Sequence, residues 1–236
     1  MNNCQFTPHY IASYCDNELR KGLKGVSEAE TDARLEAIIR LFCCLHGRDV
    51  FIKAYTKFLS SRLLNKTYLS KDAEELMLQK LKVECGHNTV NKLSQMFTDM
   101  NLSKDLMDEF KKKYNNGIIN GVEFNTEVLT NGHWPEQGTV ACTLPPEMKF
   151  CTSKFEEFYK HKYQNRNLTW LFHHGTVELQ PTFTSKKYIF VTNCYQAVIL
   201  CLFNKYSSLT YTDIKEYSAI PEAELNNSLV YLCNPK

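Results

Sequence analysis

Cysteine and histidine are the residue types in this 236-residue chain that could support metal or thiol chemistry. The ten cysteines are scattered, and none forms a C-x-x-C pair. His87 lies two residues after Cys85, but no second pair of ligands follows at the spacing of a zinc site. Free cysteine behaves as a small buried apolar group. We therefore expect mostly reduced core thiols, and we predict no metal site and no cofactor.

Two further groups of residues have the composition of a site. His173 and His174 are adjacent, and neighbouring side chains of a strand point to opposite faces, so we interpret them as turn residues and not as a metal site. Cys142 or Cys151 with His161 would resemble a thiol protease, but nothing in the sequence predicts an activated thiol. Phosphate-binding loops, dinucleotide fingerprints and hydrolase signatures do not occur in the sequence. We predict that the chain is not an enzyme.

Composition and charge exclude several classes of protein. With 43% hydrophobic and 12% aromatic residues, the chain can bury a sizeable core, which argues against a disordered protein. A net charge of +2 produces no strong field for nucleic acid or membrane. The start of the chain lacks a secretory signal, and the longest apolar run, residues 197–203, is too short to cross a bilayer. We expect a soluble protein of the cytoplasm and nucleus with no membrane partner.

Helical patterns dominate the first half of the chain. Apolar residues recur at three- and four-residue steps, most clearly over residues 49–65. Ser27 and Ser70 are expected to cap helices, because a serine side chain can accept a hydrogen bond from an amide three residues later. Ser103 is expected to cap a further, separate helix. The patterns predict a helical bundle over residues 8–117.

A strand pattern begins where the helical pattern ends. Side chains at Val122, Phe124, Thr126 and Val128 alternate with polar ones, which is typical of a strand with one buried face. Such a strand needs partners, from later in the chain or from another protein. Further elements are expected as strands at 168–172, 176–179 and 188–191, a strand or extended loop at 139–144, and a helix at 147–161. Together they predict a small α/β sheet module over residues 118–191.

Three short helices are expected near the end of the sequence, at 195–203, 211–217 and 221–232. Their order resembles a winged-helix module, and because no hairpin wing follows, residues 192–236 are interpreted as a partial winged-helix module. The last helix carries Glu222 and Glu224 but no lysine or arginine, so its charge has the wrong sign for phosphate contact, which argues against nucleic-acid binding. The fold class expected is mainly α with an α+β part.

Several stretches of the sequence occur in an order that resembles the cullin family. Residues 49–63 read D-V-F-x-x-x-Y-x-x-x-L-x-x-R-L, followed by A-E-x-x-M-x-x-K-L-K at 73–82 and K-L-x-x-M-F-x-D-M at 92–100. The strand region adds V-L-T-x-G-x-W-P at 128–135 and R-x-L-T-W at 166–170. Together with shorter matches, these motifs extend over nearly the whole chain from about residue 10.

The resemblance implies a non-catalytic scaffold subunit of a cullin-RING ubiquitin ligase, which acts in ubiquitin-dependent protein degradation. In cullins, a zinc-binding RING-box protein adds its N-terminal strand to the cullin sheet and recruits the ubiquitin-conjugating enzyme. Strand addition satisfies an exposed sheet edge through backbone hydrogen bonds. The residues expected to bind or support the RING-box protein are Val122, Phe124, Thr126, Val128, Leu129, Trp134, Leu168, Trp170, Val177 and Leu179.

Two departures from the family pattern leave alternatives open. Full cullins begin with a long helical stalk that binds substrate adaptors, and they end with a second winged-helix module whose lysine is modified by a ubiquitin-like protein. The sequence has no room for the stalk, and no modification lysine is expected in it. We therefore interpret the chain as a cullin homology region truncated at both ends. The alternatives are a truncated regulator or decoy that competes for the RING-box protein and, less favoured, a winged-helix nucleic-acid-binding protein.

Overall fold

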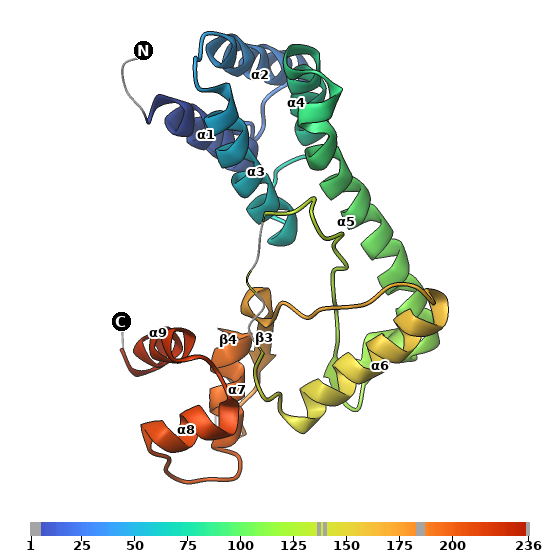
Figure 1. Cartoon of the computed structure of the whole chain (residues 1–236), viewed down its shortest axis with the longest axis vertical. Coiled ribbons are helices and arrows are strands. Elements are labelled where there is room, and N and C mark those ends of the chain that lie inside the picture. Colours follow the sequence, from blue (N-terminus) through green and yellow to red (C-terminus); the bar gives the residue numbers. More distant parts are fainter. Residues whose placement is uncertain (1–5, 136–137, 139–140, 183–186, 235–236) are drawn as a thin grey trace. The chain divides into compact units, whose positions relative to one another are not determined.

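The computed structural model of the chain describes residues 6–135, 138, 141–182 and 187–234 (Figure 1). Within these residues the fold is mainly helical with two small antiparallel sheets, which confirms the predicted fold class. The chain forms two compact units: Met1–Glu109 with Asn125–Glu136, and Phe110–Phe124 with Gln137–Lys236. Each unit is described by itself. The predicted module boundaries at residues 117 and 191 stay predictions.

Among the described residues, five helices contribute to the first unit, and the last turn of α5 belongs to the second. Their bounds are α1 (Thr7–Asn17), α2 (Glu28–Cys43), α3 (Arg48–Leu64), α4 (Lys71–Cys85) and α5 (His87–Lys113), with a π-helical turn at Glu18–Gly22. Ser27 and Ser70 cap α2 and α4 as predicted, because each hydroxyl accepts a 3.3 Å hydrogen bond from the amide three residues later. Gly86 ends α4 with a φ of +78°, which glycine adopts without strain.

Helix α5 is continuous, so the prediction of a separate helix beginning at Ser103 is wrong. Ser103 is buried within α5, and its hydroxyl accepts a 2.6 Å hydrogen bond from the backbone amide of Val128. A short hydroxyl side chain accepts an amide hydrogen bond both in a cap and in such a long-range contact. Ser103 therefore accepts an amide hydrogen bond, as a capping serine does, but the amide belongs to a distant segment and not to its own helix.

The core of the first unit lies between paired helices. Helix α1 packs along α3, and α2 packs along α4 (Figure 1). The Phe51 ring lies between its neighbours, with ring centroids 4.9 Å from Phe42 and 6.0 Å from Tyr55. All three side chains are fully buried. Phe51, Tyr55, Leu59 and Leu63 of the motif at residues 49–63 thus belong to the centre of this core, whereas Val50 is exposed.

A buried ion network also lies in this core, around Arg62 of α3. The Arg62 side chain has no exposed surface, and the Glu74 side chain of α4 is equally buried. Arg62 Nη2 donates a 2.9 Å hydrogen bond to Glu74 Oε2, and Nη1 donates a 2.6 Å bond to Asp16 Oδ1 of α1. The guanidinium also lies 5.5 Å from the centre of the Tyr55 ring. Three helices therefore meet at one paired charge.

The second unit begins with the last turn of α5 and a small hairpin. Strands β1 (Ile118–Ile119) and β2 (Val122–Glu123) pair antiparallel around Asn120-Gly121, whose φ values are +51° and +81°, as a type I′ turn requires. The rings of Phe124 and of Phe155 and Phe158 from α6 (Pro146–Lys162) surround Phe110, with ring centroids 5.2 to 6.1 Å away. Helix α6 confirms the helix predicted at 147–161.

The remaining elements of this unit are β3 (Thr176–Leu179), β4 (Phe190–Asn193), α7 (Cys194–Leu202), α8 (Tyr211–Ser218) and α9 (Glu222–Cys233). A second apolar core joins α7, α8 and α9 through Tyr195, Ile199, Ile214 and Leu225. These helices occur where the sequence predicts them. Among the described residues, no helix has the length and apolar character needed to cross a membrane.

Several predicted strands differ from the structure. Strand β3 is confirmed, whereas the strand predicted at 188–191 begins two residues later, as β4. Residues 168–171 form no strand, and Phe172–His174 is a 3₁₀ turn. Here Trp170 is held by packing and by a 2.7 Å hydrogen bond from its Nε1 to Glu156 Oε1 of α6. Residues 139 and 140 lie outside the described residues, and residues 141–144 form no strand.

The Arg62 network predicts that two neighbouring glutamates of α4 contribute very different amounts to the free energy of unfolding. Glu74→Gln should lower the free energy of unfolding by about 3 kcal/mol, because it leaves a buried guanidinium with one carboxylate less. Glu75→Gln should change it by less than about 0.5 kcal/mol, because Glu75 forms an exposed ion pair with Lys71 (3.7 Å). Denaturant unfolding of both variants measures the difference. Equal losses in the two variants would contradict the role given to Arg62.

Candidate partner-binding site

Strands β3 and β4 form a two-stranded antiparallel ribbon in the second unit. Val177 pairs with Thr192, and Leu179 pairs with Phe190. The Thr192 hydroxyl also donates a 3.2 Å hydrogen bond to the carbonyl oxygen of Val177. A ribbon of only two strands is marginally stable in water unless something packs against it or extends it. The surroundings of the ribbon therefore show whether its edges are covered within the chain or are open to a strand of another protein.

The start of α7 anchors one end of this ribbon. Asn193 Oδ1 accepts a 2.8 Å hydrogen bond from the amide of Gln196, and the Gln196 side chain accepts one of 3.1 Å from the amide of Asn193. The Cys194 amide donates a 2.9 Å bond to the carbonyl oxygen of Gly175. A Cβ atom on Gly175 would lie only 3.3 Å from the Cβ of Cys194, so glycine permits this close passage. The helix start thus fixes the register of β4.

The bond between Cys194 and Gly175 also shows which backbone groups point out of the ribbon. Hydrogen-bonded and non-hydrogen-bonded residue pairs alternate along antiparallel strands. Counting from the bonded pair of Gly175 and Cys194, the pair of Glu178 and Val191 is non-hydrogen-bonded. The N–H and C=O groups of Glu178 and Val191 therefore point away from the partner strand. Within the described part of the chain, no third strand pairs with either edge.

Large apolar side chains lie exposed at β4 and just before it. Ile189 is 65% exposed, Phe190 40% and Val191 66%. Successive strand residues face opposite sides, so apolar surface is open on both faces of the ribbon at this point. Open backbone groups beside exposed apolar side chains make an edge that readily accepts another strand. This edge of β4, with Ile189, Phe190 and Val191, is the candidate site and is called the β4 edge below.

Six of the residues predicted from the sequence belong to the second unit. Val177 and Leu179 lie in β3, and Val122 begins β2. Phe124 and Trp170 come together in the aromatic cluster around Phe155, with ring centroids 6.3 Å apart. Leu168 lies half-buried in the segment before Trp170. The structure brings Phe124 and Trp170 together as structural support, and it places Val177 and Leu179 in the ribbon.

The other four predicted residues, Thr126, Val128, Leu129 and Trp134, belong to the first unit. The strand predicted over residues 122–129 is wrong beyond Glu123, and at the end of this stretch side chains of α5 take up the backbone amides of Val128 and Thr130. Val128 donates its amide to Ser103, as described above, and Thr130 donates its amide to Asp99 Oδ2 (2.9 Å). A contact of these four residues with a partner protein stays a prediction.

Asp99 is the anchor of that stretch. Its buried carboxylate accepts the Thr130 amide, a 2.7 Å bond from Thr130 Oγ1 to Oδ1, and a 2.8 Å bond from Trp134 Nε1 to Oδ2. Trp134 in turn joins the core of the first unit. The K-L-x-x-M-F-x-D-M and V-L-T-x-G-x-W-P motifs therefore meet at Asp99. Trp134 is an apolar anchor, as predicted, but of the helical unit.

The sequence-based set of binding residues missed Ile189, Phe190 and Val191. A signal for them exists, because Tyr188 to Val191 is an unbroken run of β-forming apolar residues. Such a run is typical of a strand covered on both faces. In a two-stranded ribbon, such a strand indicates that its apolar faces are covered by another part of the chain or by another protein.

Other parts of the described structure show no chemical site. No group of three or more histidine, cysteine, aspartate or glutamate side chains could hold a metal ion within the described residues. His173 and His174 lie in the 3₁₀ turn with ring centroids 4.1 Å apart, in agreement with their interpretation as turn residues. Burial, and to a lesser degree His173, lowers the pKa of His174.

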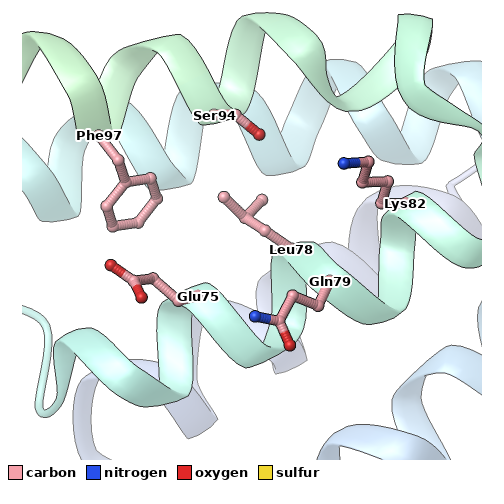
Figure 2. Close-up of a pocket in the computed structure, with 6 residues that line it drawn as sticks. All are labelled: Glu75, Leu78, Gln79, Lys82, Ser94 and Phe97. Atoms are coloured by element: carbon pink, nitrogen blue, oxygen red, sulfur yellow. The ribbon is translucent and has the colours of Figure 1, made fainter.

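A shallow groove lies between α4 and α5 (Figure 2). Figure 2 shows the side chains of Leu78 and Phe97 in the groove, with Glu75, Gln79, Lys82 and Ser94 around them. Leu78 and Phe97 are largely buried, whereas the four polar residues around them are not. Within the described residues, no hydrogen bond joins the Ser94 hydroxyl to Glu75 or Lys82, so the groove shows no activated nucleophile.

Comparison with known proteins gives the same family for both halves of the chain. The model of the cullin alpha solenoid domain matches residues 1–107, and the model of the cullin alpha+beta domain matches residues 128–236. Among curated relatives, Cullin-3 of Dictyostelium discoideum is 42% identical over 98% of this chain and 30% of its own length. Cullin-3A of Arabidopsis thaliana is 36% identical over 94% of this chain and 30% of its own length. Cullin-4A of Mus musculus is 37% identical over 93% of this chain and 29% of its own length. The chain thus spans less than a third of these relatives.

The anchoring by Asp99 predicts a local loosening that fluorescence can detect. In a Trp170→Phe background, Trp134 is the remaining tryptophan. There, Asp99→Ala should shift its emission to longer wavelength and lower the free energy of unfolding by about 3 kcal/mol, because several charge-assisted hydrogen bonds are lost. Asp105→Ala, at an exposed position of the same helix, is the matched control and should leave both unchanged. An unshifted Trp134 spectrum in the Asp99 variant would exclude the anchoring role.

Proposed function

The chain belongs to the cullin family, and we propose that it is a non-catalytic scaffold of a cullin-RING ubiquitin ligase that binds a RING-box protein at the β4 edge. The RING-box protein contributes the zinc ions and recruits the ubiquitin-conjugating enzyme. The scaffold thereby acts in ubiquitin-dependent protein degradation and needs no cofactor of its own. We place this activity in the cytoplasm and nucleus.

The observation that carries the proposal is the open backbone of Val191 beside exposed apolar side chains. Its N–H and C=O groups point out of the ribbon and can pair with a strand of another protein. Ile189, Phe190 and Val191 then supply apolar surface on both faces, which an added strand and its side chains would cover. A strand contributed by the RING-box protein satisfies both requirements at once.

The outer edge of β4 suits this partner better than the outer edge of β3. Thr176 and Glu178 are the residues of β3 with outward backbone groups, and the Glu178 side chain, opposite Val191, is exposed. A charged residue on an edge strand discourages strand addition, because pairing would remove the charge from water. The corresponding residue on β4 is the apolar Val191. Val177 and Leu179, which the sequence predicts as binding residues, belong to β3 and pair with β4 in this arrangement.

A proline at Val191 tests the proposed edge while keeping the β3–β4 hydrogen bonds. Val191→Pro removes an amide that points outward, so the ribbon should persist and binding of a purified RING-box protein should weaken by at least about tenfold. Glu178→Pro makes the same change on the other edge and should leave binding within about twofold. Isothermal titration of the two variants and the unaltered chain gives the three dissociation constants.

The same complexes separate the scaffold from its alternatives. With the ubiquitin-conjugating enzyme supplied, a complex of the unaltered chain should support ubiquitin chain synthesis. A stable complex without synthesis would favour the decoy, and a folded chain that binds no RING-box protein would overturn the proposal. Loss of binding only in Glu178→Pro would show that the RING-box protein binds the outer edge of β3 and not the β4 edge.

A further inference from the structure

Among the described residues, a group of cations lies where α5 and α6 end, in the second unit. The Lys113 ammonium of α5 lies 5.7 Å from the centre of the Phe158 ring of α6, and Phe158 packs on Phe110 with ring centroids 5.3 Å apart. The last turns of the two helices are therefore side by side (Figure 1). Their cations, together with an arginine just beyond α6, are called the basic surface below and are Lys111, Lys112, Lys113, Lys160, Lys162 and Arg166.

An aromatic ring positions the part of the basic surface that follows α6. The guanidinium of Arg166 lies 4.7 Å from the centre of the Tyr163 ring, and the Lys162 ammonium lies 5.8 Å from it. Tyr163 is itself packed, with its ring centroid 4.9 Å from that of the buried Tyr159. A cation held over a ring keeps its charge, because the ring carries none. These side chains are thus held in place and remain positive.

The basic surface is poor in acidic residues. Counting Asp108 and Glu109, which precede the three lysines of α5, residues 108–114 and 160–177 contain six lysines and arginines but two acidic residues. The last two acidic residues of α6 have other partners: Glu157 pairs with Lys154 at 2.8 Å, and Glu156 accepts the hydrogen bond from Trp170. Helix dipoles favour cations in the last turn of a helix, but this effect does not extend to Arg166 beyond α6.

The segment that leaves α6 adds hydrogen-bonding side chains to these charges. Residues 160–167 read K-H-K-Y-Q-N-R-N, without an acidic or aliphatic residue. The side chains of Gln164, Asn165 and Asn167 are exposed. An amide both donates and accepts hydrogen bonds, which suits the edge of a nucleic-acid base, and a guanidinium suits a phosphate. A row of carboxylates would use the cations but would have no matching use for the amides. The composition therefore fits a ligand that combines phosphates with bases.

We propose that the basic surface and the exposed amides of residues 164–167 bind single-stranded nucleic acid. The lysines and Arg166 contact phosphates, and the amides contact base edges. A single strand is favoured because its unpaired bases are open to side chains of a loop, whereas a duplex is read by a helix or ribbon that enters a groove. The site shares no residue with the acidic helix α9 or with the β4 edge, so it does not depend on the function proposed above.

Salt dependence tests the phosphate contacts. Each phosphate contact on a single strand contributes about −0.7 to the slope of log K against log salt concentration. With about five such contacts, a rise from about 50 to about 200 mM NaCl should weaken binding by about two orders of magnitude. Fluorescence anisotropy of a labelled single-stranded RNA of about 12 nucleotides measures the dissociation constants on the whole chain. A dissociation constant that does not change with salt would contradict the proposal.

Neutral variants of the lysines locate the binding. The triple variant Lys111→Gln/Lys112→Gln/Lys113→Gln should weaken binding at least about tenfold and make the salt slope shallower by about 2, because three phosphate contacts are lost. The control Lys24→Gln/Lys92→Gln/Lys104→Gln makes the same change in net charge at three exposed lysines of the first unit and should leave binding within about twofold. Circular dichroism checks that both variants are folded. Equal weakening in the two variants would overturn the site.

Competition separates nucleic acid from an acidic protein segment. A glutamate peptide with the same number of negative charges should displace the RNA far less effectively than unlabelled RNA does. Asn165→Ala/Asn167→Ala leaves the charge unchanged and should weaken RNA binding by about tenfold, because two hydrogen bonds to bases are lost. Displacement by the glutamate peptide as effective as that by RNA would assign the surface to an acidic segment and overturn the proposal. Binding of a duplex as tight as that of the single strand would overturn it as well.

Discussion

The burial of one positive charge is the interaction on which the first unit depends. Arg62 of α3 has no exposed surface, and its charge is balanced by Glu74 of α4 and Asp16 of α1. A buried ion pair is costly unless its geometry is right, so the three helices are restricted to the arrangement in which these groups meet. The apolar contacts of Phe51 and Tyr55 supply the packing around it. Helices that slide along an apolar stripe would lose this pairing.

The same requirement, that polar groups find partners, organises the remaining parts of the structure. Asp99 and Ser103 of α5 take up the amides and the indole N–H of the stretch that ends at Trp134, and this stretch consequently forms no sheet. In the second unit, the outward groups of Val191 have no partner strand among the described residues. Like the outer edge of β3, the β4 edge thus presents backbone groups that no other described strand takes up, but on β4 they lie beside exposed apolar side chains. That difference is the reason for placing partner binding there.

Local patterns predicted most of the helices but not the continuity of α5, and long-range contacts limited the rest. The caps at Ser27 and Ser70 involve residues three apart, so the sequence shows them directly. The alternation over residues 122–129 predicted a strand, but an extended segment bound by distant side chains has the same period of two. Asp99 and Trp134 are 35 residues apart, and no local pattern contains their contact. Of the candidate site, the sequence placed Val177 and Leu179 in a strand but did not single out Ile189, Phe190 and Val191, because exposure depends on which strands pair.

Amide hydrogen exchange, measured on the chain alone and with a RING-box protein bound, tests the central claim most directly. Strand addition at the β4 edge predicts that the Val191 amide exchanges readily in the free chain and becomes protected in the complex. The Thr130 amide, already bonded to Asp99, should change little and serves as the internal reference. A complex that forms while the Val191 amide remains unprotected would contradict the account, because the partner would then bind without extending the ribbon.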